Sequence, residues 1–241
     1  MPQSIIPPEF DSTEMPQPSE KYVCWMDIMG TGTIMPRSLE TSTIFIFKLH
    51  VAALEANDEN QVHLYPMMDG VYAVSDSKDI LLDFLERVFS SMSKDIKNNI
   101  NVDYYKYVVK ASIAFGPVVH GKDIPEEASD SLESDYKDSI LLGMPMVQAY
   151  QSEQNAPPFG VYIHESARAF APDSEKPFNH YWWEWFHPHG KDYDFHELAE
   201  HLCQNLKSYY DWCEQNNNKI GYDLDKIKTH RKLCEEYLPE P

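Results

Sequence analysis

The stretch YVCWMDIMGTG at residues 22–32 joins a run of apolar residues to an aspartate and a glycine-rich turn. Tyr22–Met26 has the composition of a short buried strand, which places Asp27 at the end of that strand. Two glycines flank a threonine at residues 30–32, a pattern typical of a tight turn into the next element. The sequence therefore predicts that a strand presents Asp27 at one edge of a sheet.

A helix is predicted after this turn, over about Thr33–Ala56. Pro36 suits the first turn of such a helix, where a missing amide hydrogen costs no hydrogen bond. Apolar residues recur at helical spacing along it, and those expected on one face are Ile44, Phe47, Val51 and Leu54.

A hairpin and a second helix are expected next. Gln61–Pro66 and Val71–Ser75 read as antiparallel strands joined tightly through residues 67–70. Ser77 is expected to cap the helix that follows. The apolar stripe of this helix consists of Ile80, Leu81, Phe84, Val88 and Met92.

The remaining pattern completes an alternation of strands and helices. We expect an extended arm at residues 1–20, a strand at Tyr107–Phe115 ended by Gly116-Pro117, another from Val118, a polar loop at 122–138, a helix at Pro145–Asn155, a strand at Phe159–Ile163, and helices at Phe195–Glu214 and Asp223–Tyr237. The order β-α-β-β-α-β predicts an α+β fold with a ferredoxin-like palm core. We assign this core to residues 21–190 and a C-terminal helical extension to residues 191–241.

Charge limits the possible partners. The 241 residues include 20 basic and 39 acidic side chains, a net charge of -19. This balance argues against DNA, RNA or an anionic membrane as the partner. It leaves room for a small anionic substrate, because metal ions can supply positive charge.

Several features indicate a cytoplasmic protein. The four cysteines lack CxxC spacing, which is typical of free thiols in a reducing compartment. The apolar runs are too short to span a bilayer, and no signal segment opens the chain.

Asp27 and Asp69 are candidates for a shared site. In a βαββ unit the first and third strands are neighbours, so the two carboxylates are expected to meet at one sheet edge. Two adjacent carboxylates repel each other and favour Mg²⁺ or Mn²⁺ between them. Backbone amides around Gly30, Thr31 and Gly32 are placed to bind phosphate oxygens. The alternative is that both aspartates serve only local turn geometry.

Four segments resemble, in order, the motifs of class III nucleotidyl cyclases, over roughly residues 20–170. Residues 23–30, VCWMDIMG, resemble Phe-x-Asp-Ile-x-Gly-Phe, and residues 65–73, YPMMDGVYA, resemble Lys-x-x-Gly-Asp. Residues 110–121, KASIAFGPVVHG, resemble Arg-Val-Gly-Ile-His-Thr-Gly-x-Val-x-x-Gly. Residues 143–153 keep the spacing of Gly-Asp-x-Val-Asn-x-Ala-x-Arg-x-Glu.

The resemblance implies a metal-dependent cyclisation of a nucleoside triphosphate, with release of pyrophosphate. It implies that Asp27 and Asp69 hold two Mg²⁺ or Mn²⁺ ions, helped by the backbone carbonyl of Ile28. Lys110 stands where the family has a phosphate-binding arginine, or it is a strand-edge lysine that faces solvent. Lysine would keep the charge but lose the bidentate geometry.

The chain departs from the family where purine cyclases read their base. The two base-reading positions hold Tyr65 and Ile140, and the positions of the transition-state asparagine and arginine hold Val147 and Gln151. We assign Tyr65 and Ile140 to base binding and Gln151 to catalysis, on the resemblance alone. Tyr65 could equally be a core aromatic. The departures leave open a different base, a catalytically silent relative, or a shifted alignment of this segment.

The length and the degenerate segment at 143–153 resemble the Pycsar-type pyrimidine cyclases of bacterial antiphage defence. This resemblance implies a uridylate cyclase that converts UTP to 3′,5′-cyclic UMP as a second messenger. CTP as the substrate, a silent nucleotide- or partner-binding module, and a nucleotidyl transferase are the alternatives; the charge argues against the last. The family also implies a head-to-tail homodimer with its sites at the interface.

A segment rich in aromatic residues and histidine, residues 180–189, has no assigned chemistry. No cysteine lies close and the spacing fits no familiar zinc set, so we do not expect a zinc site. Its alternating aromatic residues predict a strand that packs on the core or on a dimer mate.

Overall fold

The computed structural model describes residues 9–98, 106–128, 131–187 and 195–240. The element bounds of the sheet are β1 Ser19–Ile28, β2 His63–Met67, β3 Gly70–Ser75, β4 Val109–His120, β5 Leu141–Gly143, β6 Val161–Ile163 and β7 Trp182–Trp183. The helices are α1 Thr31–Ile34, α2 Leu39–Ala56, α3 Lys78–Asn98, α4 Ser134–Asp138, α5 Met144–Ser152, α6 Glu165–Ala169, α7 His196–Ile220 and α8 Leu224–Tyr237. No described helix combines the length and the apolar character that crossing a membrane requires.

The strand order confirms the predicted fold class. The sheet runs β2-β3-β1-β4-β6-β7, with β5 pairing with the far end of β4. Strand β1 is antiparallel to both β3 and β4 and lies between them, as in a ferredoxin-like βαββαβ unit. The β4–β6 pair is parallel, so β6 adds a further strand to this unit beside β4.

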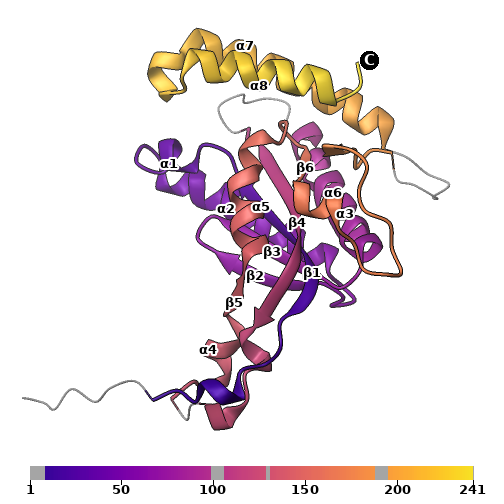
Figure 1. Ribbon diagram of the computed structural model, residues 1–241. Coiled ribbons are helices and arrows are strands. Elements are labelled where there is room, and N and C mark those ends of the chain that lie inside the picture. Colours follow the sequence, from indigo (N-terminus) through magenta and orange to yellow (C-terminus); the bar gives the residue numbers. More distant parts are fainter. Residues whose placement is uncertain (1–8, 99–105, 129–130, 188–194, 241) are drawn as a thin grey trace, which may run out of the picture.

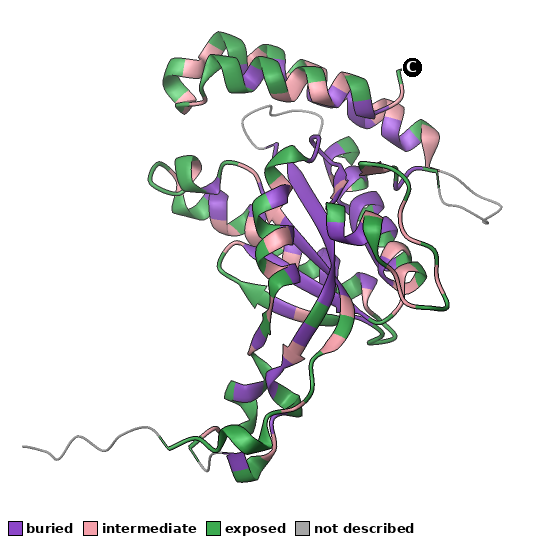
Figure 2. Ribbon diagram, in the orientation of Figure 1, coloured by how far each residue is buried: buried purple, intermediate pink, exposed green. Residues whose placement is uncertain are grey.

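Alternating side chains of β1 enter two different cores. Tyr22, Cys24, Met26 and Ile28 pack into the larger core, with residues of α2, α3 and α7. Val23 and Trp25 pack into a smaller core, with residues of β2, β3 and α5. Both faces of the sheet are therefore covered, which explains the continuous apolar run of this strand (Figure 2).

The two ends of the sheet carry different additions (Figure 1). The C-terminal helices α7 and α8 lie side by side across the end where β1 finishes. At the other end, residues 9–18 pack against the short helices that follow β4, with the amide of Asp11 donating to the carbonyl of Ala128 at 2.8 Å. The predicted arm at 1–20 includes residues 1–8, which lie outside the described residues.

The helix predicted over 33–56 is wrong in two respects. Pro36 does not lie in its first turn, because α1 ends at Ile34 and α2 begins at Leu39. The predicted stripe is the exposed face of α2, with Phe47 64% and Leu54 66% exposed. The face that packs into the core consists of Phe45, Leu49, Ala52, Ala53 and Ala56.

Smaller differences concern the second half of the core. Strand β4 continues through Gly116 and Pro117 instead of ending there. Residues 122–138 contain three short helical segments rather than a plain loop. The cap of α3 also differs, because the Ser77 hydroxyl donates to Glu175, whose carboxylate accepts from the amide of Lys78.

Candidate functional site

Asp27 and Asp69 lie at the same edge of the sheet. Asp27 is opposite Gly70 in the β1–β3 register, and Asp69 directly precedes Gly70 in the β2–β3 turn. The hydroxyl of Thr31 donates to the Oδ2 atom of Asp69. Residues distant in sequence are therefore brought together by strand pairing, as the sequence predicted.

Gly70 fixes the turn that carries Asp69. A Cβ atom at this position would lie 2.4 Å from the Trp25 ring and 2.5 Å from the carbonyl oxygen of Met26. Any other residue would push the hairpin away from β1. The contact with Trp25 thus determines how closely Asp69 approaches Asp27.

The surroundings of Asp27 oppose its negative charge. Burial raises the pKa of Asp27 to about 7, and the carboxylates of Asp69 and Glu153 add to this shift. Among the described residues, nothing donates a hydrogen bond to its buried Oδ1 atom. The backbone amide of Ile28 and the charge of Lys110 compensate an ionised Asp27 only in part, and a bound cation would stabilise this state further.

Lys110 faces this site and not the solvent. It is opposite Asp27 in the β1–β4 register and is 3% exposed. Its Nζ atom donates to the carbonyl of Gln154 at 3.2 Å and lies 3.9 Å from Glu153 Oε1. Burial lowers the pKa of Lys110, while Glu153 and Asp27 raise it. The interpretation of Lys110 as a solvent-facing strand lysine is therefore wrong.

Glu153 is a charged residue of this site that the sequence did not assign. Burial raises its pKa, and Lys110 lowers it. The signal was present, because Glu153 ends the segment at 143–153 whose spacing resembles a cyclase motif. Its position after α5 brings that segment to the edge that carries Asp27.

The turn at Gly30, Thr31 and Gly32 opens a much shorter helix than expected. Gly30 adopts a left-handed conformation with φ 81° and precedes α1, which has four residues. Thr31 is 5% exposed, and its hydroxyl binds Asp69. The turn thus contacts the aspartate pair through Thr31. The helix that begins there is short and not the long helix that was expected.

The residues assigned to base binding lie elsewhere in the chain. Tyr65 is 5% exposed, packs in the smaller core and shares a hydrogen bond of 2.5 Å with Nδ1 of His120. Ile140 precedes β5 and accepts from the amide of Gly121, at the opposite end of β4 from Lys110. Within one chain, neither residue is presented to Asp27.

Gln151 and Val147 lie on the exposed side of α5. The neighbouring residue, Ser152, points the other way and shares a hydrogen bond with Ser112 of β4 at 2.7 Å. Ile28, the remaining assigned residue, is 1% exposed and follows Asp27 in β1. The site in one chain therefore consists of Asp27, Asp69, Lys110 and Glu153.

The described residues do not form a complete metal cage. Across them, no three histidine, cysteine, aspartate or glutamate side chains are grouped so that they could hold an ion. Two carboxylates at this edge still suit Mg²⁺, which is commonly bound by one or two carboxylates together with substrate phosphates. The buried Oδ1 atom of Asp27 that lacks a hydrogen bond fits this arrangement.

Comparisons with known proteins return cyclase domains. No protein-family model matches the sequence, and no curated protein does. Among solved structures, the monomeric guanylyl cyclase domain of the RhoGC fusion protein from Blastocladiella emersonii matches with 17% identity and a TM-score of 0.47, over 64% of this chain and 85% of that chain. The guanylate cyclase domain of RhGC from Catenaria anguillulae, in complex with GTP, matches with 14% identity and a TM-score of 0.46, over 63% and 81%. Adenylate cyclases from Trypanosoma brucei match with 9% identity and a TM-score of 0.46, over 64% and 77%.

These likenesses concern the fold. At such low identity, they do not carry the chemistry of those proteins over to this chain.

Proposed function

We propose that this protein is a nucleotide cyclase that converts UTP to 3′,5′-cyclic UMP and pyrophosphate. The observation that carries the proposal is the pairing of Asp27 with Asp69 at one sheet edge, beside the buried amine of Lys110. A cyclase needs negative side chains that bind metal and a positive group that binds phosphate. Both kinds of group are present at this edge.

Asp27 and Asp69 would hold two divalent ions, Mg²⁺ or Mn²⁺, and the carbonyl of Ile28 would complete this shell. Bound ions would lower the pKa of the attacking hydroxyl and neutralise the triphosphate. The protein orients these carboxylates through the Thr31 hydroxyl and the Gly70 turn. The Thr31 bond occupies Oδ2 of Asp69 and leaves its other oxygen for an ion.

In the reaction, the 3′-oxygen of the nucleotide forms a bond with the α-phosphorus. The bond from this phosphorus to the bridging oxygen of the β-phosphate breaks, and the hydroxyl proton is lost to solvent. Lys110 would hold a phosphate oxygen through its amine. Glu153, at 3.9 Å, would position that amine and keep it charged.

A second copy of the chain would complete the site. Tyr65, Ile140 and Gln151 are assigned to the base and the transition state but do not face Asp27 in their own chain. A head-to-tail homodimer would bring Ile140 and Gln151 from the mate, whereas Tyr65 is buried in the smaller core and does not face an interface. The outer side of α5 supports such an interface, because it exposes three large apolar side chains, Met144, Val147 and Tyr150.

The choice of base rests on the resemblance to the pyrimidine cyclases of antiphage defence. The proposed function also includes a role in that defence. UTP is preferred because the assigned positions offer no carboxylate that would accept from the amino group of cytosine. CTP is the alternative substrate. A silent nucleotide-binding module is the alternative function, and Val147 and Gln151 support it because they replace two transition-state residues.

The decisive experiment is a product assay with each of the four ribonucleoside triphosphates and Mn²⁺. Cyclic UMP is expected from UTP, and Asp69→Asn should abolish it while the circular dichroism spectrum stays unchanged. If no triphosphate gives a cyclic product, the protein is not a cyclase. If only ATP or GTP is cyclised, the assignment of the base is wrong.

A further inference from the structure

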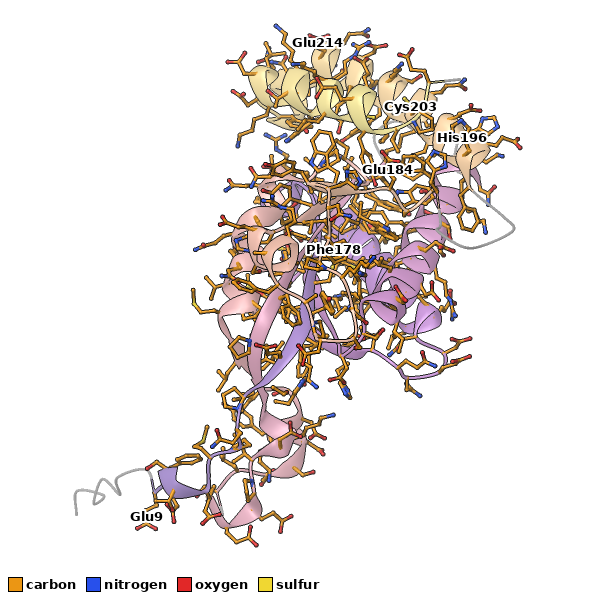
Figure 3. The ribbon with its side chains drawn as sticks, turned by 45° about the vertical axis from the view of Figure 1, so that its right-hand side comes forward. Glu9, Phe178, Glu184, His196, Cys203 and Glu214 are labelled. Carbon is orange, nitrogen blue, oxygen red and sulfur yellow. The ribbon has the colours of Figure 1, made fainter. Side chains whose placement is uncertain are left out.

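A cavity of about 270 Å³ lies between the end of the sheet and the C-terminal helix pair. Met29 and Gly30 line it from the turn after β1, and Lys106 and Tyr107 line it from the segment before β4. Residues of α7, α8 and the turn between them form its other wall. We call it the hairpin cavity. Figure 3 shows side chains filling most of the space between this helix pair and the sheet, and Glu214 pointing away from it.

The hairpin cavity is basic in an acidic protein. Among the residues that the structure describes, four cationic side chains line it, from Arg37, Lys106, Lys219 and Lys226. Among the described lining residues, Asp223 is the one acid, and its carboxylate accepts from the amides of Asp225 and Lys226 as the cap of α8. The whole chain carries almost twice as many acidic as basic residues, so this local excess of cations favours an anion.

The chain makes specific room for Arg37 at this wall. Its guanidinium donates to the carbonyl of Lys219 at 2.8 Å, which joins the turn after α1 to the end of α7. Gly221 ends α7 in a left-handed conformation with φ 64°, and a Cβ atom there would lie 2.2 Å from an Arg37 nitrogen. The glycine thus permits both the turn and the approach of the arginine.

Aromatic rings and a neutral imidazole complete the lining. Trp212 and Tyr222 contribute rings from the helix pair, and His230 shares a hydrogen bond of 2.5 Å with the Tyr222 hydroxyl. Burial lowers the pKa of His230 to about 4, and the nearby charges of Lys110 and Lys226 add to this shift. The cavity adjoins the edge that carries Asp27, because Met29 and Gly30, which line it, directly follow the end of β1.

We propose that the hairpin cavity binds a phosphate-bearing ligand no larger than a mononucleotide. Arg37, Lys219 and Lys226 would hold the phosphate oxygens, since charged hydrogen bonds to phosphate are among the strong ones. Trp212 stacks on Tyr209, and a planar base would contact this aromatic pair from the cavity side. The volume lies slightly below the usual range of about 300–1,000 Å³ for drug-sized ligands, which excludes a fully enclosed nucleoside triphosphate.

The cavity is connected to the proposed catalytic site through the turn after β1. Gly30 lines the cavity, and the next residue, Thr31, donates to Asp69. A ligand that presses on this turn would therefore shift the carboxylate pair. This effect on catalysis rests on the proposed function, whereas binding in the cavity does not.

Calorimetric titration of the full chain in EDTA tests the proposal, because the aspartate site should bind no phosphate without metal. The probes are inorganic pyrophosphate and UMP. We expect at least one to bind, and Lys226→Glu to weaken it by about tenfold or more, the loss of one charged contact. Lys228→Glu makes the same charge change on an exposed residue of α8 outside the cavity, and should change affinity less than twofold.

The outcomes separate the sources and the alternatives. Tighter binding of UMP than of pyrophosphate identifies a nucleotide as the ligand. Tighter binding of pyrophosphate than of UMP identifies a free inorganic phosphate compound. The proposal fails if neither probe binds, or if both variants weaken binding equally. It also fails if Asp69→Asn abolishes binding in EDTA, because the ligand would then occupy the aspartate site. Cyclase activity, measured separately with Mn²⁺, is not needed for any of these results.

Discussion

Asp27 and Lys110 lie directly opposite each other in the β1–β4 register, and burial opposes the charge on both side chains. It raises the pKa of Asp27 to about 7 and lowers the pKa of Lys110. Their mutual attraction acts in the reverse direction but does not cancel the effect on Asp27. The ionisation of this edge therefore responds to pH and to bound cations near neutrality.

Asp27→Asn should stabilise the metal-free protein at pH 8. The pKa of Asp27 is about 7 when folded and near 3.8 when unfolded, so the folded state binds the proton more tightly. Stability is then lost as pH rises from about 4 to 7, and the full penalty applies above that window. Removing the charge should recover about 2–4 kcal/mol, measured by urea unfolding in EDTA.

The same titrations at pH 4 provide the control for this prediction. There Asp27 is protonated in the folded state and about half protonated in the unfolded state, so the variant and the wild type should differ by less than about 1 kcal/mol. If Asp27→Asn does not stabilise the protein more at pH 8 than at pH 4, burial does not penalise the charge of this carboxylate.

Mn²⁺ should raise the melting temperature more at pH 8 than at pH 5.5. Metal binds the ionised carboxylate, and Asp27 is mostly protonated at the lower pH. A ligand at 100 times its dissociation constant stabilises the folded state by about 2.7 kcal/mol, or a shift of several degrees. Asp69→Asn should remove most of the shift at pH 8. Equal shifts at both pH values would mean that the ion binds elsewhere.

Lys110 and Glu153 should be energetically coupled. Lys110→Met leaves the half-buried carboxylates of Glu153 and Asp27 without their buried cation, and should destabilise the protein by about 3 kcal/mol. Glu153→Gln in the same chain should restore part of this loss, because it removes one of the two unbalanced charges. A double-mutant cycle measures the coupling, expected at about 1–2 kcal/mol. Additive effects would show that Nζ of Lys110 and Oε1 of Glu153, which are 3.9 Å apart, do not interact as an ion pair.

The sequence predicted the sheet well because its signals there are local. The run at Tyr22–Met26, the tight turn before Gly70 and the stripe of α3 each depend on neighbouring residues. The meeting of Asp27 with Asp69 followed from the order of elements alone. Lys110 could not be placed, because its burial depends on α5 and the residues after it, far along the chain.

Helical periodicity alone does not identify the buried face of α2. Both sides of this helix are apolar, so the residues at 44, 47, 51 and 54 and those at 45, 49, 52 and 56 both repeat at helical spacing. The set with the smaller side chains, rich in alanine, packs into the larger core against α3 and the sheet, where Ala52 and Ala53 are buried. Close packing selects the small side chains, and this choice depends on how closely α2 approaches α3 and the sheet in the folded chain.

Gly70→Ala should impair both stability and the proposed activity, because the added Cβ would overlap the Trp25 ring and a backbone oxygen of β1. Overpacking of this kind costs about 1–3 kcal/mol, and it would also move Asp69 away from Asp27. We expect a melting temperature lower by about 3–10 °C and a cyclisation rate reduced by more than the loss of folded protein explains. Gly32→Ala is the matched control for the melting temperature, because nothing lies within 4 Å of its added Cβ. If the two variants behave alike, the contact between Gly70 and Trp25 does not set the position of Asp69.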